Sequence, residues 1–413
     1  MKNLKSIIDK QLPREIALLL HIAGKAAVDN GEKLYLVGGT VRDLLLNRSS
    51  LDLDLAMEGN AIKFARQIAV EMGAKLAIHQ QFGTANFQRG EFTIDIAMAR
   101  CETYAHPGAL PTVKPAKIKD DLSRRDFSVN AMAVDLSPDT FGNLLDFHDG
   151  ASDLEKKLIR ILHKKSFIDD ATRILRAIRF EQRLGFNIED GTERLLRRNV
   201  VRLNTISGDR LRNELELLLN EELPEKALAR AEELGVLRQI TRSLKSDEWL
   251  ADRFTEARQR YTSGPAVYFA LLTYDLGRDN AEAISERLNL SGEWKRIILG
   301  VAKINDDIHK LADPAISPST VYRFLKRYPV EAVSACFLSN ESRIVRNQIE
   351  RYLKELQYVQ IHLNGNELKR MGVETGPRLG RILKALQDAK LDGLADTREE
   401  EETFVQYWLQ THK

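Results

Sequence analysis

Residues 51–59 read LDLDLAMEG, with leucine and aspartate alternating from Leu51 to Leu55. In a β-strand, successive side chains point to opposite faces, so Asp52 and Asp54 would share one face while the leucines pack into a core. Two adjacent carboxylates repel each other unless a cation lies between them. The stretch therefore predicts a strand whose acidic face either meets water or holds a metal ion, and the spacing alone leaves both interpretations open.

The flanking sequence predicts that this strand belongs to an α/β unit over residues 28–136. A short apolar run ends in Gly38-Gly39 and precedes a helical segment, and residues 60–73 carry apolar side chains at helical spacing. Residues 75–99 read as two or three strands with glycine turns. Residues 1–30 are expected to be helical.

After about residue 145, helical patterns replace the strand patterns. The acidic segment 397–404 is expected to be a solvated helix start. The predicted fold class is therefore α+β, with an α/β head followed by a long all-α remainder. We predict helices over residues 166–184, 190–200, 208–220, 224–236, 281–290, 341–360 and 376–390, with joints at the Pro/Gly/Ser clusters near 262–265 and 312–319.

The composition is typical of a soluble globular protein, because 43% of the 413 residues are hydrophobic and 30% are charged. No apolar run reaches the roughly 18–20 residues of a membrane span, and the N-terminal residues read as an amphipathic helix rather than a signal peptide. Cys101 and Cys336 lie far apart in the sequence, so we expect a reducing cytoplasm. The net charge is only +2, which means that any nucleic-acid contact must be local.

The residues before the acidic strand suit a phosphate group. Gly38 and Gly39, at a turn between a strand and a helix, expose backbone N–H groups, and Arg42 adds a permanent positive charge. Glycines that serve only the backbone of a plain turn are the alternative. Followed by two carboxylates, this order suits phosphoryl transfer with Mg²⁺. Asp95, in a similar strand, is a candidate third carboxylate or a half-exposed strand residue.

Two later stretches carry arginine beside acidic or amide side chains. In residues 120–135, Arg125, Asp126 and Asn130 suit a triphosphate and ribose hydroxyls, or form an ion-paired helix start. In residues 167–186, Asp170 and Arg173 lie at positions i and i+3 of one predicted helix and would share a face.

On that predicted helix, Arg176 and Arg179 continue the face that carries Asp170 and Arg173. An aspartate accepts from an exocyclic amine and an arginine donates to ring nitrogens or a carbonyl, so such a pair can read cytosine and adenine alike. Uracil and guanine would place a carbonyl against the carboxylate. A helical salt-bridge ladder without a ligand is the alternative.

Taken together, these stretches resemble the class II tRNA nucleotidyltransferases, which are the bacterial-type CCA-adding enzymes and their poly(A) polymerase relatives. They occur in the family's order and cover most of the chain. The similar segments are LVGGTVRD (36–43), LDLDLA (51–56), RRDFSVNAMA (124–133), DGASDLEKKLIRIL (149–162), DDATRILRAIRF (169–180), ISGDRLRNELELLL (206–219) and NGNELKRMGVETGPRLGRIL (364–383).

The resemblance implies a polymerase-β-like nucleotidyltransferase head over residues 1–138, a neck over 139–205, a body over 206–315 and a tail over 316–413. It implies an enzyme that adds C or A from CTP or ATP to the 3′ end of tRNA with Mg²⁺. The implied metal ligands are Asp52, Asp54 and, as a candidate, Asp95; the implied nucleotide contacts are Gly38, Gly39, Arg42, Arg125, Asp126, Asn130, Asp170, Arg173, Arg176 and Arg179.

Several members of this family differ only in the nucleotides that they add, and the sequence leaves those alternatives open. Residues 101–122 correspond to the stretch that governs the switch from adding C to adding A. They lack the charged sequence motif of many CCA-adding members. A CC-adding or an A-adding enzyme is therefore an alternative, a poly(A) polymerase a less favoured one, and a non-catalytic tRNA-binding protein an alternative of another class. Asp169 stands where the family usually has glutamate.

Overall fold

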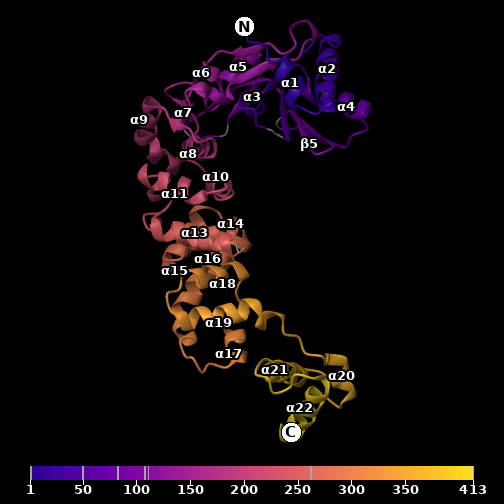
Figure 1. Cartoon of the computed structure of the whole chain (residues 1–413), viewed down its shortest axis with the longest axis vertical. Coiled ribbons are helices and arrows are strands. Elements are labelled where there is room, and N and C mark those ends of the chain that lie inside the picture. The colour runs from indigo at the N-terminus through magenta and orange to yellow at the C-terminus, as the bar shows by residue number, and fades with distance from the viewer. Residues whose placement is uncertain are drawn as a thin grey trace. The chain divides into compact units, whose positions relative to one another are not determined.

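The computed structural model describes residues 2–412 apart from residues 49–50, 81–82, 107, 110 and 261–262. The chain divides into two compact units, which we call unit 1 and unit 2 (Figure 1). Unit 1 comprises residues 1–214 and 233–239, and unit 2 comprises residues 215–232 and 240–413. Each unit is described by itself below.

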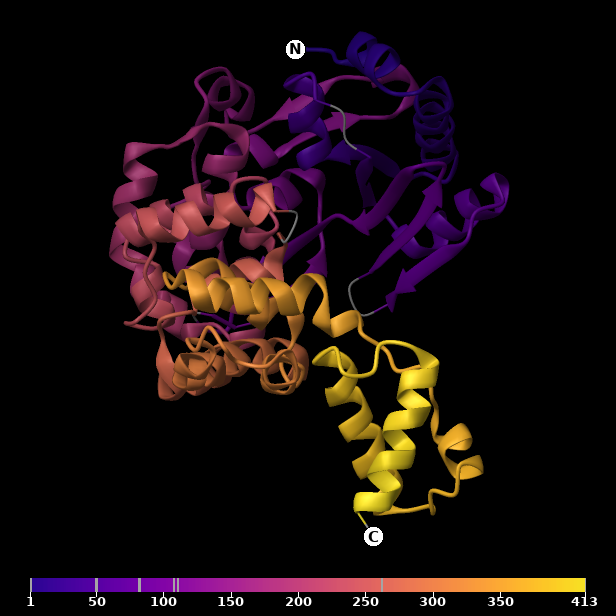
Figure 2. The same cartoon turned by 60° about the horizontal axis from the view of Figure 1, so that its bottom comes forward.

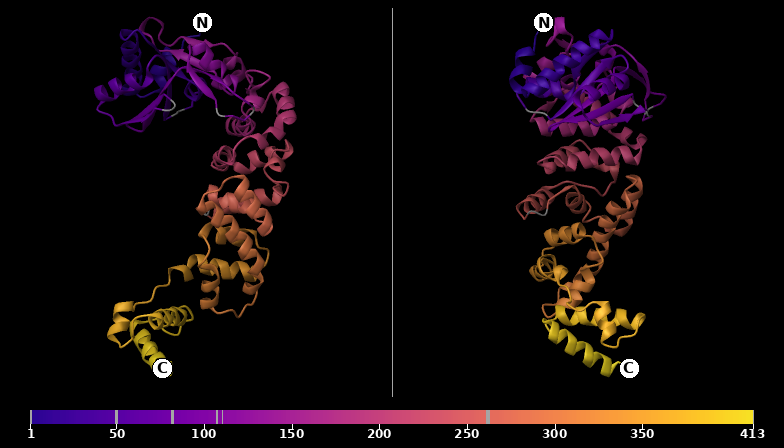
Figure 3. Two further views of the ribbon diagram at one scale, coloured as in Figure 1. Left: turned by 180° about the vertical axis from the view of Figure 1, so that it is seen from behind. Right: turned by 90° about the vertical axis from the view of Figure 1, so that its right-hand side faces the viewer.

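Unit 1 is built around a mixed sheet. Within the described residues, seven strands form this sheet in the order β3-β4-β5-β2-β1-β8-β9. β2 and β5 run parallel, and the other neighbours are antiparallel. Both views of Figure 3 show the arrows gathered in the indigo-to-magenta part of the ribbon. The strands are β1 (Lys33–Val37), β2 (Asp52–Glu58), β3 (Leu76–His79), β4 (Thr84–Arg89), β5 (Phe92–Met98), β8 (Met132–Asp135) and β9 (Leu144–Asp146).

Local sequence explains the central elements of the sheet. In β2, Leu53 and Leu55 are buried, whereas Asp52 is exposed and Asp54 is half-buried, so the predicted alternation is confirmed. Gly38 then leads into α3 (Gly39–Leu45), as predicted. Helix α4 (Ala61–Met72) begins where the Asn60 side chain accepts from the Lys63 N–H and ends at Gly73, in the left-handed conformation.

Helices cover the sheet and bury its apolar side chains. α4 packs against β3, β4 and β5, and α2 (Arg14–Asp29) packs against β1. One cluster of buried residues joins the sheet to α5 (Ile118–Ser123) and comprises Tyr35, Val37, Ala56, Ile118, Leu122 and Ala133. Residues 1–30 form α1 (Lys5–Gln11) and α2 instead of one helix, because Pro13 lacks the N–H that an unbroken helix needs.

Helices dominate the remainder, as predicted, apart from the two-residue strands β10 (Leu158–Ile159) and β11 (Asn187–Ile188). The fold class α+β is confirmed. The helices are α6 (Gly150–Glu155), α7 (Ser166–Asp169), α8 (Thr172–Leu184), α9 (Asp190–Asn199), α10 (Gly208–Leu219), α11 (Pro224–Glu233), α12 (Leu237–Ile240), α13 (Glu248–Gln259), α14 (Pro265–Leu272), α15 (Gly277–Arg287), α16 (Gly292–Asp307), α17 (Pro318–Leu325), α18 (Val330–Ser339), α19 (Arg343–Lys354), α20 (Gly365–Arg370), α21 (Pro377–Leu391) and α22 (Arg398–Thr411).

The sequence did not predict several helices of unit 2. α14 and α18 are buried along almost their whole length, so they lack the polar face whose period reveals an amphipathic helix. At the joint predicted over 312–319, α17 begins at Pro318, but the division of the chain into two units does not fall there. The joint predicted at 262–265 falls partly on residues outside the described ones. Where the structure describes the chain, no helix is both long and apolar enough to cross a membrane.

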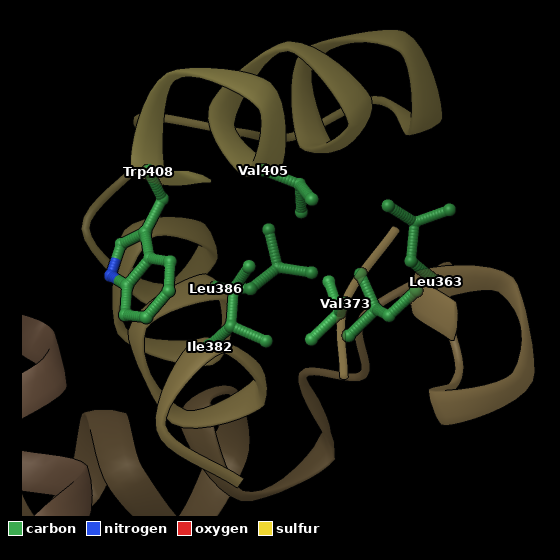
Figure 4. Packing of buried hydrophobic residues seen from close by; sticks show 7 residues of the cluster. Leu363, Val373, Ile382, Leu386, Val405 and Trp408 are labelled. Atoms are coloured by element: carbon green, nitrogen blue, oxygen red, sulfur yellow. The ribbon is translucent and has the colours of Figure 1, made fainter. Parts of the chain in front are cut away.

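The last three helices, α20, α21 and α22, pack together at the yellow end of the chain (Figure 2). Their shared core is a cluster of seven buried residues, most of which Figure 4 labels. The acidic segment 397–404 begins α22, as predicted, but it is not solvated throughout. Glu401 is fully buried and accepts hydrogen bonds from Lys390 Nζ at 2.8 Å and from the backbone N–H of Leu363 at 2.9 Å. The prediction of a solvated start was wrong for Glu401, because these donors replace water.

Candidate active site

A cavity of about 740 Å³ in unit 1 brings together residues from six separate segments. They come from α3 and the turn before it, from β2, from the segment that supplies Glu102, Tyr104 and Pro111, from the segment 124–130, from α8 with the preceding Asp170, and from α10. Its described lining lacks two of the predicted site residues, Asp95 and Arg179. The predicted site residues that line it are Gly38, Gly39, Arg42, Asp52, Asp54, Arg125, Asp126, Asn130, Asp170, Arg173 and Arg176.

The acidic side of the cavity is formed by β2. Thr40 Oγ1 accepts from the Asp54 N–H and donates to the Asp52 carbonyl oxygen, both at 3.1 Å, so α3 is tied to the acidic strand. Burial raises the pKa of Asp54, the Arg125 guanidinium lowers it, and Asp95 and Asp52 raise it again; the net pKa lies above its ordinary value. Negative charge is therefore crowded here, as at a site that takes up a cation.

Asp95 is opposite Asp54 in the register of the parallel strands β2 and β5. It accepts a hydrogen bond from the Asn86 side chain, and burial raises its pKa. Among the residues that the structure describes, no group of three or more His, Cys, Asp and Glu side chains is placed to hold a metal ion. A metal at Asp52 and Asp54 would therefore complete its coordination with oxygen atoms of a ligand or of water.

Gly38 lies where the acidic and basic sides of the cavity meet. Its φ is +66°, a left-handed conformation that favours glycine. A methyl group added there would lie 2.6 Å from Arg125 Nη1 and 3.7 Å from Asp54 Oδ2. The remaining Arg125 nitrogens donate to Asp121, at 3.0 Å from Nη2 and 3.3 Å from Nε. Asp121, which is almost fully buried, therefore aims the free end of Arg125 at Gly38 and Asp54.

A chain of hydrogen bonds connects Arg42 to Arg176. Arg42 donates to both oxygens of Asp43 and, from Nη1, to Asn130 Oδ1 at 2.7 Å. Asn130 Nδ2 donates to Asp126 Oδ1 at 3.1 Å, and the Nε and Nη2 atoms of Arg176 donate to Asp126 Oδ2 at 2.9 and 2.6 Å. The network fixes both arginines at the cavity wall.

This network bears on the predicted ribose contact of Asp126. Its Oδ1 also accepts from the Phe127 N–H at 2.8 Å, so both carboxylate oxygens already have two donors. Burial alone would raise the pKa of Asp126, but Arg176 and Asn130 outweigh it and the net pKa lies below its ordinary value. Asp126 is therefore an ionised structural centre of the site, and a ribose hydroxyl would have to displace one of its donors.

The predicted continuous helix over 166–184 was wrong, because the chain leaves the helix at Asp170. α7 ends at Asp169, Asp170 is extended with φ −141° and ψ 103°, and α8 begins at Thr172. Asp170 Oδ1 accepts from the N–H and Oγ1 of Thr172 at 2.9 and 2.6 Å. This bonding pattern is that of a helix-capping aspartate, which competes with an unbroken helix.

Asp170 and Arg173 both line the cavity but do not pair with each other in a helical ladder. Asp170 Oδ1 takes a further bond from Arg210 Nη2 at 2.7 Å, whereas Oδ2 receives no hydrogen bond from the described residues. Arg173 is held by Ser166 Oγ and by the Arg124 carbonyl oxygen, both at 2.6 Å. One acceptor of Asp170 thus remains for a ligand, beside an arginine whose position is fixed.

Arg179 is buried and does not belong to the described lining of the cavity, and its role as a ligand contact stays a prediction. Its guanidinium lies 3.7 Å from Glu214 Oε2 and 5.0 Å from the Phe180 ring centroid. On α8, Arg173, Arg176, Phe180 and Arg183 line the cavity, whereas the Arg179 guanidinium is turned toward Glu214 of α10.

Sequence reasoning assigned no role to several further cavity residues, among them Phe180, Arg210 and Glu214. Arg210 and Glu214 are four residues apart in α10, so they lie on one face of that helix. Glu214 lies 3.6 Å from Arg176 Nη1. The sequence did contain a signal for Arg210 and Glu214. Both lie in the segment 206–219, which is similar to a family motif, but that similarity assigned them no role.

The chain is similar to known proteins over most of its length. The family model of the poly A polymerase head domain matches residues 34–160, and that of the probable RNA and SrmB-binding site of polymerase A matches residues 185–247. The A-adding tRNA nucleotidyltransferase of Halalkalibacterium halodurans is 32% identical over 100% of this chain and 96% of its own length. The solved Thermotoga maritima CCA-adding enzyme complexed with tRNA is 31% identical, with a TM-score of 0.76 and 99% of each chain covered.

A further relative, the A-adding tRNA nucleotidyltransferase of Geobacter sulfurreducens, is longer than this chain. It is 35% identical over 96% of this chain, which spans 47% of the relative's length. The matched head and RNA-binding models, the full-length relative and the shared fold all point to one group of transferases. The chain belongs to the class II tRNA nucleotidyltransferase family.

Proposed function

We propose that this chain is an A-adding tRNA nucleotidyltransferase, which transfers AMP from ATP to the 3′-hydroxyl of a tRNA that ends in CC. The main support for this proposal is that several kinds of side chain line one cavity. They are the β2 carboxylates, the guanidinium groups of Arg42, Arg125 and Arg176, and the Asp170 and Arg173 side chains. In the reaction the 3′-oxygen bonds to the α-phosphorus and pyrophosphate leaves. The names of the two relatives favour A addition over CC or CCA addition.

Asp52 and Asp54 are proposed to hold Mg²⁺, because magnesium prefers carboxylate and phosphate oxygens and both carboxylates line the cavity from one strand. When bound, magnesium polarises the phosphate and stabilises the charge of the attacking and leaving oxygens. The candidate role of Asp95 as a third ligand stays a prediction.

The basic side of the cavity is proposed to bind the triphosphate. Arg125 Nη1 faces Gly38, and Arg42 and Arg176 are held at the same wall by Asp43, Asn130 and Asp126. Permanent, planar guanidinium groups suit phosphate oxygens. The division of the chain at residues 138, 205 and 315 into head, neck, body and tail also stays a prediction.

The open acceptor of Asp170 is proposed to read the exocyclic amine of adenine, while Arg173 donates to a ring nitrogen. Guanine and uracil would place a carbonyl oxygen against the carboxylate. Cytosine offers the same amine and acceptor, so this pair explains discrimination against GTP and UTP and leaves the choice between ATP and CTP to other parts of the site.

Single-nucleotide mapping of product ends tests the proposal. The purified chain is incubated with Mg²⁺ and tRNA transcripts that end at the discriminator base, at C and at CC, with ATP, CTP or both. We expect one A on the CC-ended transcript and no growth of the other two. Growth of the shortest transcript to CC or to CCA would replace the proposal with a CC-adding or a complete enzyme, and open-ended A addition would indicate a poly(A) polymerase. The absence of any addition would leave a tRNA-binding protein.

Replacing Gly38 by alanine is expected to lower the affinity for ATP about ten-fold and to destabilise the chain by about 1–2 kcal/mol. The new methyl group meets Arg125 Nη1 at 2.6 Å, and the left-handed backbone strains any side chain. Gly73→Ala is the matched control, because Gly73 has φ +62° and open space around its Cβ. It should share the loss of stability, measured by urea unfolding, and keep wild-type ATP affinity. Equal affinities in the two variants would contradict the role of Arg125.

Replacing Arg210 by alanine is expected to lower kcat/KM for ATP about ten-fold and to weaken discrimination between ATP and GTP. Without its bond to Arg210, the Asp170 carboxylate is held by Thr172 alone and can turn. The measurement is kcat/KM for each nucleotide on the CC-ended transcript. Arg212→Ala is the control, since Arg212 pairs with Asp209 on the same helix. Unchanged discrimination in Arg210→Ala would show that Asp170 does not depend on Arg210.

A further inference from the structure

Phe180 occupies an unusual position for a core aromatic residue, because several cations surround its ring. It lies in α8, is 7% exposed and lines the cavity. The Cζ atoms of Arg42 and Arg176 lie 5.4 and 5.5 Å from its ring centroid. On the apolar side, the edge-on ring of Phe127 lies 5.9 Å away at 79°. Phe180 thus connects α3 and α8 beneath two of the arginines proposed to bind the triphosphate.

The ring and the neighbouring acids constrain these guanidinium groups in complementary ways. Asp43 and Asn130 accept hydrogen bonds in the plane of the Arg42 guanidinium, and Asp126 accepts them in the plane of Arg176. The face of an aromatic ring attracts a cation placed over it, and a planar guanidinium group can stack there. Hydrogen-bond acceptors and a ring that lies beneath the Cζ atoms together restrict the position of each group.

We propose that Phe180 is a positioning residue, which holds the guanidinium groups of Arg42 and Arg176 in the orientation that receives the nucleotide triphosphate. Identification of the ligand as ATP rests on the proposed function. Because the like charges of Arg42, Arg176 and Arg179 are all held close to one ring, loss of the ring lets them separate and fluctuate. Each arginine must then be ordered again when the triphosphate binds, at the expense of affinity.

Two substitutions at position 180 separate this role from packing. Phe180→Leu keeps an apolar side chain but removes the ring, and Phe180→Tyr keeps the ring. We expect Phe180→Leu to raise both the Kd for ATP, measured calorimetrically without tRNA, and the KM about ten-fold, with kcat within about two-fold of wild type. Phe180→Tyr should restore wild-type values. If Phe180→Leu does not fold, Phe180→Met is measured in the same way.

Phe64→Leu is the matched control, because Phe64 is 1% exposed in α4 and packs away from the cavity lining. It should lose stability comparably and keep wild-type ATP affinity. The proposal is overturned if Phe180→Leu binds ATP as wild type does, if Phe64→Leu loses as much affinity, or if Phe180→Tyr fails to restore binding. A wild-type chain that binds ATP but never extends tRNA would refute the proposed function, while the calorimetric comparison would still decide the role of Phe180.

Discussion

Replacing Asp54 by asparagine is expected to slow nucleotide addition at least about a thousand-fold, because a metal-binding carboxylate contributes several kcal/mol to the transition state. The fold should be unharmed. Asparagine has nearly the same shape, and the substitution removes a carboxylate whose pKa is raised by burial and by neighbouring acids. The free energy of unfolding should therefore equal or exceed that of wild type. The measurements are the rate of AMP addition to CC-ended tRNA and the urea midpoint.

Glu58→Gln is the matched control for Asp54→Asn, because Glu58 lies on the same strand and loses the same charge. Glu58 accepts from the Ile118 N–H at 2.7 Å, a bond that glutamine can retain, and it lies outside the described lining of the catalytic cavity. We expect this control to keep wild-type activity and tRNA affinity. Substantial nucleotide addition by Asp54→Asn would contradict the assignment of Asp54 as a metal ligand.

Replacing Asp126 by alanine is expected to destabilise unit 1 by about 3–5 kcal/mol, the usual cost of removing one partner of a buried ion pair. The change deprives Arg176, Asn130 and the Phe127 N–H of their shared acceptor. Hydrogen exchange in peptides from α8 should rise steeply. The exposed Asp139 offers a control, for which Asp139→Ala should shift stability by less than about 0.5 kcal/mol.

Tryptophan fluorescence gives this experiment an internal reference. The three tryptophans, Trp249, Trp294 and Trp408, all lie in unit 2. The fluorescence signal of these tryptophans follows the unfolding of unit 2. In Asp126→Ala, this signal should change less than the hydrogen exchange of peptides from α8. Equal protection of α8 in wild type and variant would show that Asp126 is not the structural centre of the site.

Asp126 also predicts how the stability of unit 1 depends on pH. The pKa of Asp126 is lower in the folded chain than its ordinary value. Its contribution is therefore fully present above the unfolded pKa of about 3.9 and is lost as pH falls through the folded pKa. Asp126→Ala lacks this contribution, so the difference in stability between wild type and variant should shrink as pH falls below about 4. A constant difference down to pH 2 would contradict an ionised Asp126.

The local sequence was sufficient to predict those helices and strands whose formation depends only on neighbouring residues. The alternation in β2 depends only on the two-residue period of a strand, and α4 is bounded by its own Asn60 cap and Gly73. Eleven of the site residues predicted from the motifs, from Gly38 to Arg176, also line the cavity. Such predictions succeed because the required information, periodicity or a short motif, lies within a few neighbouring residues.

Only the tertiary structure decided which groups are open to a ligand. Asp126 was predicted from its motif, yet its oxygens are taken by Arg176, fifty positions away in the chain. Asp170 leaves the helix and meets Arg210, and Glu401 is buried by Lys390 and the backbone of Leu363. The sequence by itself determined the strands, the capped helices and the family motifs. The pairing of each charge was decided by partners distant in the sequence, because an ionised side chain is buried only where the fold brings it a donor or a counter-ion.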